Sequence, residues 1–248
     1  MIKEKVKVLQ VIPVLGYGGA ETGCYDLAHF LPEKGCKSFI VTSGGELLKF
    51  IDKKKVKVFK LPVQSKNPIL ILFNAIIISF IILVYNINIV HARSRAPAWS
   101  CFLATRFTFR KFVTTYHGTY NFNNKIKKFY NSIMVRSDLI IAGSNFIFSH
   151  INQNYGNFFL KKKRKLLVIF RGINTNYFNP QKILPIKLDK FSKQNNIDRN
   201  KFIILLPGRI TYWKGQKIFI EAIKLLYEKS DTPPLEAIIL GSDQGRNV

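Results

Sequence analysis

A short motif near the end of the chain combines two cations with glycines in a pattern suited to phosphate binding. Segment 207–215 follows an apolar run, 202–206, and precedes an amphipathic helix. We expect Gly208 to let the backbone turn tightly beside a ligand, while the helix directs free N–H groups and its positive dipole end at the same point. Arg209 can fork onto two phosphate oxygens, and Lys214 can add a point charge. These residues also suit an ordinary strand-to-helix turn with solvated cations, so the rest of the chain has to decide.

Further cations and a histidine follow predicted strands earlier in the chain. Arg93, His117 and Arg171 each stand just after a short apolar run. Open α/β sheets bind ligands at the carboxyl ends of their strands, so these side chains are candidates for a cleft. A lone histidine is often structural, but His117 stands beside Gly118 at a strand end, and a role in the site is the alternative.

The first glycine loop, 16–19, lies between the first predicted strand and the first predicted helix. It resembles a dinucleotide fingerprint, but Glu21 stands where the third glycine of that fingerprint belongs, and we reject that interpretation. What remains is a glycine turn before a helix, with a carboxylate in the first helical turn, where the helix dipole favours it.

Apolar runs and helical periodicity alternate along the chain, which predicts an α/β fold with a parallel sheet. The first helix carries an apolar face at helical spacing and closes at Gly35. Ser144 is the predicted N-cap of a helix over 145–154. Periodicity is lost over 179–200, and a domain linker is expected there. The predicted strands are 6–14, 38–42, 56–61, 89–92, 112–116, 139–142, 166–169, 202–206 and 235–240.

One stretch, 69–85, is apolar apart from Asn74 and Ser79. Its length is at the bottom of the range for a membrane-spanning helix, and it runs on towards the strand at 89–92. Pro68 marks a helix start. We favour a buried or membrane-leaning helix over a true span. A helix that is apolar nearly all round has to be covered by neighbouring elements or by a bilayer surface.

The composition describes a globular, strongly basic protein. The 248 residues include 39 Lys and Arg against 14 Asp and Glu, a formal net charge of +25. Such a balance implies an anionic partner, although lysines scattered over solvated faces by coding bias are the alternative. The three cysteines, Cys24, Cys36 and Cys101, fit neither a disulfide framework nor a zinc site. The N-terminus shows no signal-peptide pattern, so we expect a cytoplasmic protein.

Taken together, the motifs resemble glycosyltransferase family 4, the retaining enzymes with the GT-B fold. A further stretch, 91–99, resembles bacterial members tied to cell-surface polysaccharide or lipopolysaccharide assembly. The resemblance covers residues 6 to 246. In chain order the motifs are Gly18–Glu21, His117–Gly118, Arg171–Ile173, Pro207–Arg209 with Trp213–Gly215, and Gly241–Arg246.

The resemblance implies a GT-B fold with two Rossmann-like domains facing a cleft. We therefore expect a Rossmann-like, parallel-sheet acceptor-side domain over 1–180, a linker over 181–200, and an incomplete donor domain over 201–248 with about two strands.

By the same resemblance, the substrate is a nucleotide-sugar, and no cofactor or metal is expected. Roles are implied for nine residues. Arg209 and Lys214 hold the donor diphosphate, with Gly241 in the donor-binding loop. Gly18 and Gly19 approach the phosphate and the acceptor. His117 sits by the transferred sugar as the catalytic candidate, and Glu21, Arg93 and Arg171 line the cleft.

One departure from the family is as informative as the match. The second domain normally continues into an acidic motif that grips the donor sugar, and this sequence stops before one. We expect a truncated product, a fragment, or a split-gene half whose missing part a separate chain supplies, with impaired activity. A non-catalytic remnant with the same fold is the main alternative.

Two partner classes are weighed beside this. A nucleic-acid binder would explain the charge, but no ribonucleoprotein, helix-turn-helix or zinc-finger pattern is present, and we expect no nucleic acid. Peripheral attachment to an anionic inner leaflet is expected from 69–85 together with Lys125, Lys127, Lys128 and the basic run 161–165. The acceptor would then be a lipid-linked or cell-envelope glycan.

Overall fold

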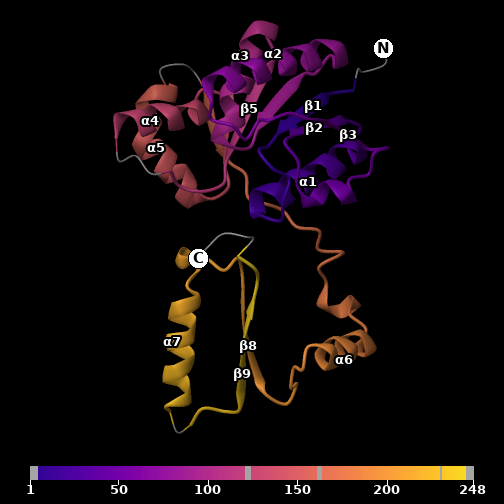
Figure 1. The fold of residues 1–248 in the computed structure, drawn as a ribbon, viewed down its shortest axis with the longest axis vertical. Coiled ribbons are helices and arrows are strands. Elements are labelled where there is room, and N and C mark those ends of the chain that lie inside the picture. Colours follow the sequence, from indigo (N-terminus) through magenta and orange to yellow (C-terminus); the bar gives the residue numbers. More distant parts are fainter. Residues whose placement is uncertain (1–4, 121–123, 161–163, 230, 244–248) are drawn as a thin grey trace. The chain divides into compact units, whose positions relative to one another are not determined.

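The computed structural model describes residues 5–120, 124–160, 164–229 and 231–243. The chain divides into two compact units, Met1–Gly172 and Ile173–Val248 (Figure 1). The sequence predicted the end of the first domain at residue 180, a few residues later. Each unit is described by itself below.

The first unit is built on a seven-stranded sheet in the order β3-β2-β1-β4-β5-β6-β7, in which every neighbouring pair is parallel. The order reverses between β1 and β4, which makes the topological switch point where such sheets bind ligands. The α/β fold class predicted from the sequence is confirmed. The strands are β1 (Lys7–Val11), β2 (Lys37–Thr42), β3 (Val56–Lys60), β4 (Ile89–Ala92), β5 (Lys111–Tyr116), β6 (Leu139–Ala142) and β7 (Lys165–Val168).

Helices cover both faces of this sheet, with α2 and α3 on one side and α1 on the other (Figure 1). Alternate residues of a strand face opposite sides, so Leu9 and Val11 join the core under α2 and α3, whereas Ile12 joins the core under α1. Ser144 caps α5 as predicted, its Oγ accepting from the Ile147 N–H at 3.2 Å. The helices are α1 (Gly19–Glu33), η1 (Glu46–Phe50), α2 (Pro68–Tyr85), α3 (Arg95–Thr108), α4 (Lys125–Asn131), η2 (Ser132–Val135) and α5 (Asn145–Leu160).

Helix α2 contains the apolar stretch 69–85 of the sequence. The Asn67 side chain accepts from the Ile69 N–H at 2.9 Å, Pro68 occupies the first turn, and Asn86 ends the helix in the left-handed region. By length and composition α2 is able to cross a membrane, a test that core helices of soluble proteins also pass. Its inner side is buried, with Ile78 and Ile82 in the core. Its outer side is exposed.

The second unit contains a two-stranded parallel sheet of β8 (Phe202–Pro207) and β9 (Leu235–Leu240), as predicted. The expected linker contains a helix, α6 (Pro185–Gln194), which begins at Pro185. This helix was not predicted, because the segment lacks apolar periodicity. Within the described residues, α7 (Gln216–Tyr227) buries no side chain. Two strands cannot bury both faces of a parallel sheet. Two 3-10 turns complete this unit, η3 (Pro180–Lys182) and η4 (Tyr212–Lys214).

Candidate functional site

In the first unit, the predicted site residues gather at the carboxyl edge of the sheet. The loop after β1 brings Gly18 and Gly19 to the start of α1, while Arg93 follows β4 and His117 follows β5. Strand β4 pairs with both β1 and β5, so these three strand ends are neighbours. The side chain of Arg171, beyond β7, reaches the same place.

Arg93 places a buried positive charge at this edge. The residue is 8% exposed, and its Nη1 donates to Gln10 Oε1 at 3.1 Å. Gln10 is fully buried and is itself held by donation from its Nε2 to the Cys24 carbonyl oxygen at 3.1 Å. Within the described residues, the Arg93 Nε has no hydrogen-bond partner and no carboxylate forms an ion pair with the guanidinium. Burial lowers the pKa of Arg93, as does the charge of Arg171. A buried cation that forms no ion pair favours an anionic ligand.

Arg171 clamps the first turn of α1. Its Nη1 donates to the Gly19 carbonyl oxygen at 2.7 Å, and its Nη2 donates to Thr22 Oγ1 at 2.6 Å and approaches Asp26 Oδ2 at 3.4 Å. The neighbouring Gly23 makes room for both arginines. A Cβ on Gly23 would lie 3.0 Å from the Arg93 Nη2 and 3.6 Å from the Arg171 Nε. The two guanidinium groups therefore converge on one face of α1.

Two histidines stand beside these cations. The pKa of His117 is lowered to about 4, first by the desolvation of its ring and then by the charges of Arg93 and Arg171. His91 is buried, with its Nε2 2.7 Å from Thr115 Oγ1, and burial followed by Arg93 and His117 lowers its pKa well below the usual value. Both imidazoles are neutral at pH 7. His117 lies on the exposed side of this pair and is available to exchange hydrogen bonds with a bound group.

Glu21 lies at the start of α1, where its carboxylate folds back over Gly18. A Cβ on Gly18 would overlap this carboxylate. The position confirms the expected carboxylate in the first helical turn, near the positive end of the dipole. The negative charge also lies close enough to Arg93 to raise its pKa slightly against the larger effect of burial.

In the second unit, Arg209, Lys214 and Gly241 lie at the carboxyl ends of β8 and β9 and before α7. The Arg209 carbonyl oxygen accepts from Gln216 Nε2 at 2.8 Å, which ties the strand end to the start of the helix. The chain bends at Gly208, directly after β8, as the sequence predicted. The left-handed conformation lies further on, at Gly215 with φ of 78°, where the short turn η4 ends before α7.

Gly241 is required by a close approach of the two strand ends. A Cβ on Gly241 would overlap the Gly208 carbonyl oxygen and would lie 2.8 Å from the Gly208 carbonyl carbon. The Gly208 N–H donates to the Leu240 carbonyl oxygen at 2.8 Å, and the Ile210 N–H donates to that of Ser242 at 3.0 Å. The loop after β8, which carries Arg209, is therefore held by the loop after β9.

The described part of the chain holds no group of three His, Cys, Asp or Glu side chains able to bind a metal ion. All three cysteines are free thiols, and burial raises the pKa of Cys24 to about 12. The expectation of a metal-independent site stays a prediction. Residues 161–163 of the basic run lie outside the described residues.

The structure thus brings six predicted residues together in the first unit and three in the second. Sequence reasoning missed the residues that support the first group. Gln10 had a signal, since it interrupts an apolar strand. The other supporting residues had no such signal. Their contacts depend on strand order and helix position, which no local sequence pattern indicates; they are Thr22, Gly23, Asp26 and His91.

Comparison with known proteins decides the family. Residues 17–177, more than half of the chain, match the family model described as Glycosyltransferase Family 4. The chain belongs to glycosyltransferase family 4. Among curated proteins, none matches the chain.

Several solved structures share the fold of this chain. A glycosyltransferase from Rickettsia africae ESF-5 is 41% identical with a TM-score of 0.81, over 96% of this chain and 61% of that one. Anabaena HepE in complex with UDP-glucose is 18% identical with a TM-score of 0.72, over 96% and 61%. The lipopolysaccharide outer core galactosyltransferase WaaB is 15% identical with a TM-score of 0.58, over 96% and 61%. The chain therefore spans about 61% of the length of these relatives.

Proposed function

We propose that this family 4 protein serves the transfer of a sugar from a nucleotide-sugar donor to a hydroxyl group of a cell-envelope acceptor. The observation that carries the proposal is the 41% identity to the Rickettsia glycosyltransferase over 96% of this chain. In the reaction, the bond between the sugar C1 and the diphosphate breaks, and the nucleoside diphosphate leaves. A bond from C1 to the acceptor oxygen forms, and the hydroxyl proton passes to the departing diphosphate or to solvent. The family implies retention of configuration at C1.

The donor is assigned to the second unit. Arg209 and Lys214 provide two cations at a strand-to-helix junction, where the N-terminus of α7 adds free N–H groups and a positive dipole end. Such an arrangement can bind a diphosphate and stabilise its charge as it leaves, which is the role that a divalent ion has in other transferases. UDP-glucose is the first donor to test, since HepE binds it.

The acceptor is assigned to the carboxyl edge of the first unit. The convergent guanidinium groups of Arg93 and Arg171 favour an anionic group, such as the phosphate of a lipid-linked acceptor. A neutral imidazole at His117 can hydrogen-bond to a sugar hydroxyl without adding charge. The lipopolysaccharide acceptor of WaaB gives a further reason to test envelope glycans.

The experiment has two arms. Isothermal titration of the chain with UDP-glucose and with a GDP-sugar measures donor binding, and a radiolabelled UDP-sugar with bacterial envelope lipid measures transfer, with and without EDTA. We expect binding of one donor class and EDTA-insensitive transfer. Binding without transfer would favour the alternative, a non-catalytic or split GT-B protein that needs a partner chain. Absence of nucleotide binding, or displacement of the nucleotide by duplex DNA, would contradict the proposal.

A further inference from the structure

The outer side of α2 is an apolar surface that the first unit leaves uncovered. The inner side packs into the core through residues such as Ile78 and Ile82. The outer side carries seven large apolar side chains between 48% and 77% exposed. Contiguous exposed apolar surface of this kind marks an interaction site. These side chains are Ile69, Leu72, Phe73, Ile76, Phe80, Leu83 and Val84.

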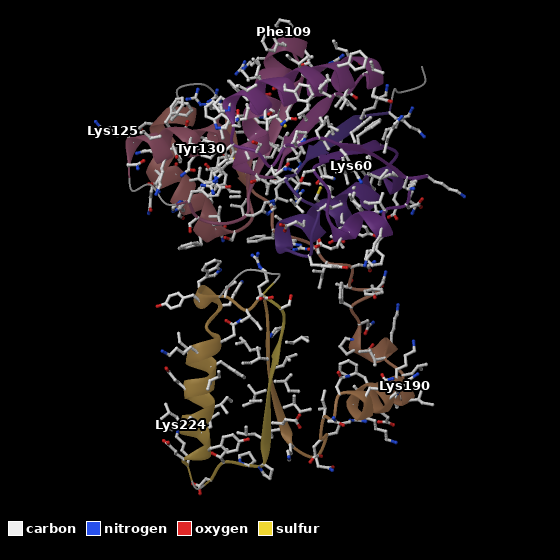
Figure 2. All side chains as sticks on the ribbon, viewed as in Figure 1. Lys60, Phe109, Lys125, Tyr130, Lys190 and Lys224 are labelled. Atoms are coloured by element: carbon white, nitrogen blue, oxygen red, sulfur yellow. The ribbon has the colours of Figure 1, made fainter. Side chains whose placement is uncertain are left out.

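Two phenylalanines at the end of α3 extend this surface. Phe107 is 70% exposed and Phe109 is 94% exposed. Phe109 caps α3 in the left-handed region with φ of 54°, a conformation that is costly for a bulky side chain. Figure 2 shows Phe109 at the outer edge of the first unit, on the side of α2 and α3. The backbone therefore holds an aromatic ring in solvent at the edge of the apolar surface.

A cationic pocket opens beside Phe109. It has a volume of about 240 Å³, and its charged lining consists of Arg106, Arg110, Lys111, Arg136 and a single carboxylate, Asp138. The carboxylate is already engaged, because Asp138 Oδ2 accepts from the Phe112 N–H at 2.9 Å. Within the described residues, none of these four cations forms an ion pair. The pocket therefore offers uncompensated positive charge.

The pocket and the apolar surface are connected. Arg110 Nη2 donates to Asn86 Oδ1 at 2.8 Å, and Asn86 caps the end of α2, two residues after the exposed Val84. The cations also crowd one another. Burial lowers the pKa of Arg164, and the charges of Arg106 and Arg136 lower it further. A bound anion would relieve this repulsion.

We infer that this side of the protein docks on the surface of an anionic phospholipid bilayer. The outer face of α2, with Phe107 and Phe109, enters the boundary between headgroups and acyl chains. The pocket formed by Arg106, Arg110, Lys111 and Arg136 takes a lipid headgroup phosphate. The inference gives the membrane attachment expected from the sequence a defined surface, and it does not depend on transferase activity.

The charges favour a bilayer over a protein or a second copy of this chain. The net charge of +25 opposes self-association, and a second copy would bring like charges to the same pocket. A protein partner would have to present an apolar groove opposite α2 and, beside it, carboxylates opposite the cationic pocket. A bilayer offers phosphates everywhere along its surface, with apolar depth directly beneath them. The earlier candidates Lys125, Lys127 and Lys128 are exposed on α4 and remain available to assist.

The test is co-sedimentation of the full chain with vesicles of phosphatidylcholine alone and of an equimolar mixture with phosphatidylglycerol. We expect binding to the anionic vesicles that weakens with salt. The double substitution Phe80→Ser with Phe109→Ser should weaken vesicle binding roughly tenfold or more, because it removes two rings from the apolar surface. The core should stay intact, since both rings are exposed. Arg106→Gln with Lys111→Gln should reduce vesicle binding by a similar roughly tenfold factor. Lys53→Gln with Lys54→Gln removes the same charge elsewhere on the first unit and should leave binding unchanged.

Each alternative has a distinct result that overturns the inference. Equal binding to both kinds of vesicle would rule out docking on an anionic bilayer through this surface. Binding that neither the phenylalanine pair nor the Arg106 and Lys111 pair weakens would rule it out as well. Dimerisation in analytical ultracentrifugation that both phenylalanine substitutions abolish would assign the surface to a second copy. Inorganic phosphate that binds the pocket, in a protein that ignores vesicles, would make it a site for a free anion. Thermal melting of every variant identifies any that fails to fold.

Discussion

Arg171 donates a 2.7 Å hydrogen bond to the carbonyl oxygen of Gly19, a residue 152 positions earlier in the chain. The contact ties the segment after β7 to the first turn of α1, where the glycine loop lies. One guanidinium thereby fixes the position of this loop and adds positive charge beside Arg93. The fork geometry matters, because the second arm reaches Thr22 Oγ1 at 2.6 Å.

We predict that Arg171→Lys loosens the start of α1 while it keeps the charge. An ammonium group cannot bridge the Gly19 carbonyl oxygen and Thr22 Oγ1 with the same planar fork. The side chain is 47% exposed, so the free energy of unfolding should fall by only about 0.5–1.5 kcal/mol. Amide hydrogen exchange in the first turn of α1 should become faster. In a double-mutant cycle with Thr22→Val the two effects should not add; full additivity would show that Arg171 and Thr22 are not energetically coupled.

A second prediction concerns the stability of the protein at acidic pH. His91 and His117 have folded-state pKa values below the unfolded value of 6.5, so the unfolded chain binds more protons as the pH falls below 6.5. Their contribution to stability is complete above pH 6.5 and is lost as the pH falls towards about 4, the value for His117. Urea unfolding between these limits should show stability decreasing with acid.

The matched variant for this prediction is His91→Gln, which keeps a hydrogen-bonding group near Thr115 but cannot gain a proton. Its stability should depend on pH less steeply, by about one proton. The unsubstituted chain is the reference, because the lowered pKa values that set its slope are those of His91 and His117. An unchanged slope in His91→Gln would show that His91 does not titrate between the two states.

Much of the fold follows from local patterns. Each predicted strand of the sheet is present, because continuous apolar runs of strand length, bounded by glycines and helices, describe a parallel sheet buried on both faces. The extent of α3, together with α4 and α6, was missed. Helix α6 has a polar, lysine-rich sequence whose apolar residues remain exposed, so no buried face marked it.

The site was predictable only in its outline. Glycines and cations at strand ends indicated Arg93, His117 and Arg171, because their position relative to a strand is visible in the sequence. Their partners were not, since Gln10 meets Arg93 only when β1 pairs with β4. The outer face of α2 could not be predicted either. A helix that is apolar all round carries no sign of which side the sheet will cover.

A third prediction concerns Gly241. In Gly241→Ala the new methyl group would overlap the backbone of Gly208, so the two strand ends have to separate. We expect a loss of roughly 1–3 kcal/mol in the stability of the second unit, as for other overpacked sites. Faster exchange of the Gly208 and Ile210 amides should accompany it. Gly208→Ala is the control, because a Cβ there meets nothing within 4 Å. Equal effects of both substitutions would argue against a close contact.

The last prediction separates a diphosphate site from an ordinary turn. Arg209→Lys keeps the charge but loses bidentate geometry, and it should weaken nucleotide binding measurably. Lys214→Ala should remove a charge-assisted contact worth about 1.5–3 kcal/mol, about tenfold or more in affinity. Lys224→Ala is the matched control, since Lys224 is an exposed cation near the other end of α7 (Figure 2).

Titration calorimetry with UDP and UDP-glucose, beside the thermal midpoint of each variant, makes this comparison. The midpoints should be unchanged, because within the described residues neither side chain at the strand end is buried. If Arg209→Lys and Lys214→Ala both bind the nucleotide as tightly as the Lys224→Ala protein does, the cations at 209 and 214 are solvated surface charges. The donor would then have to bind elsewhere.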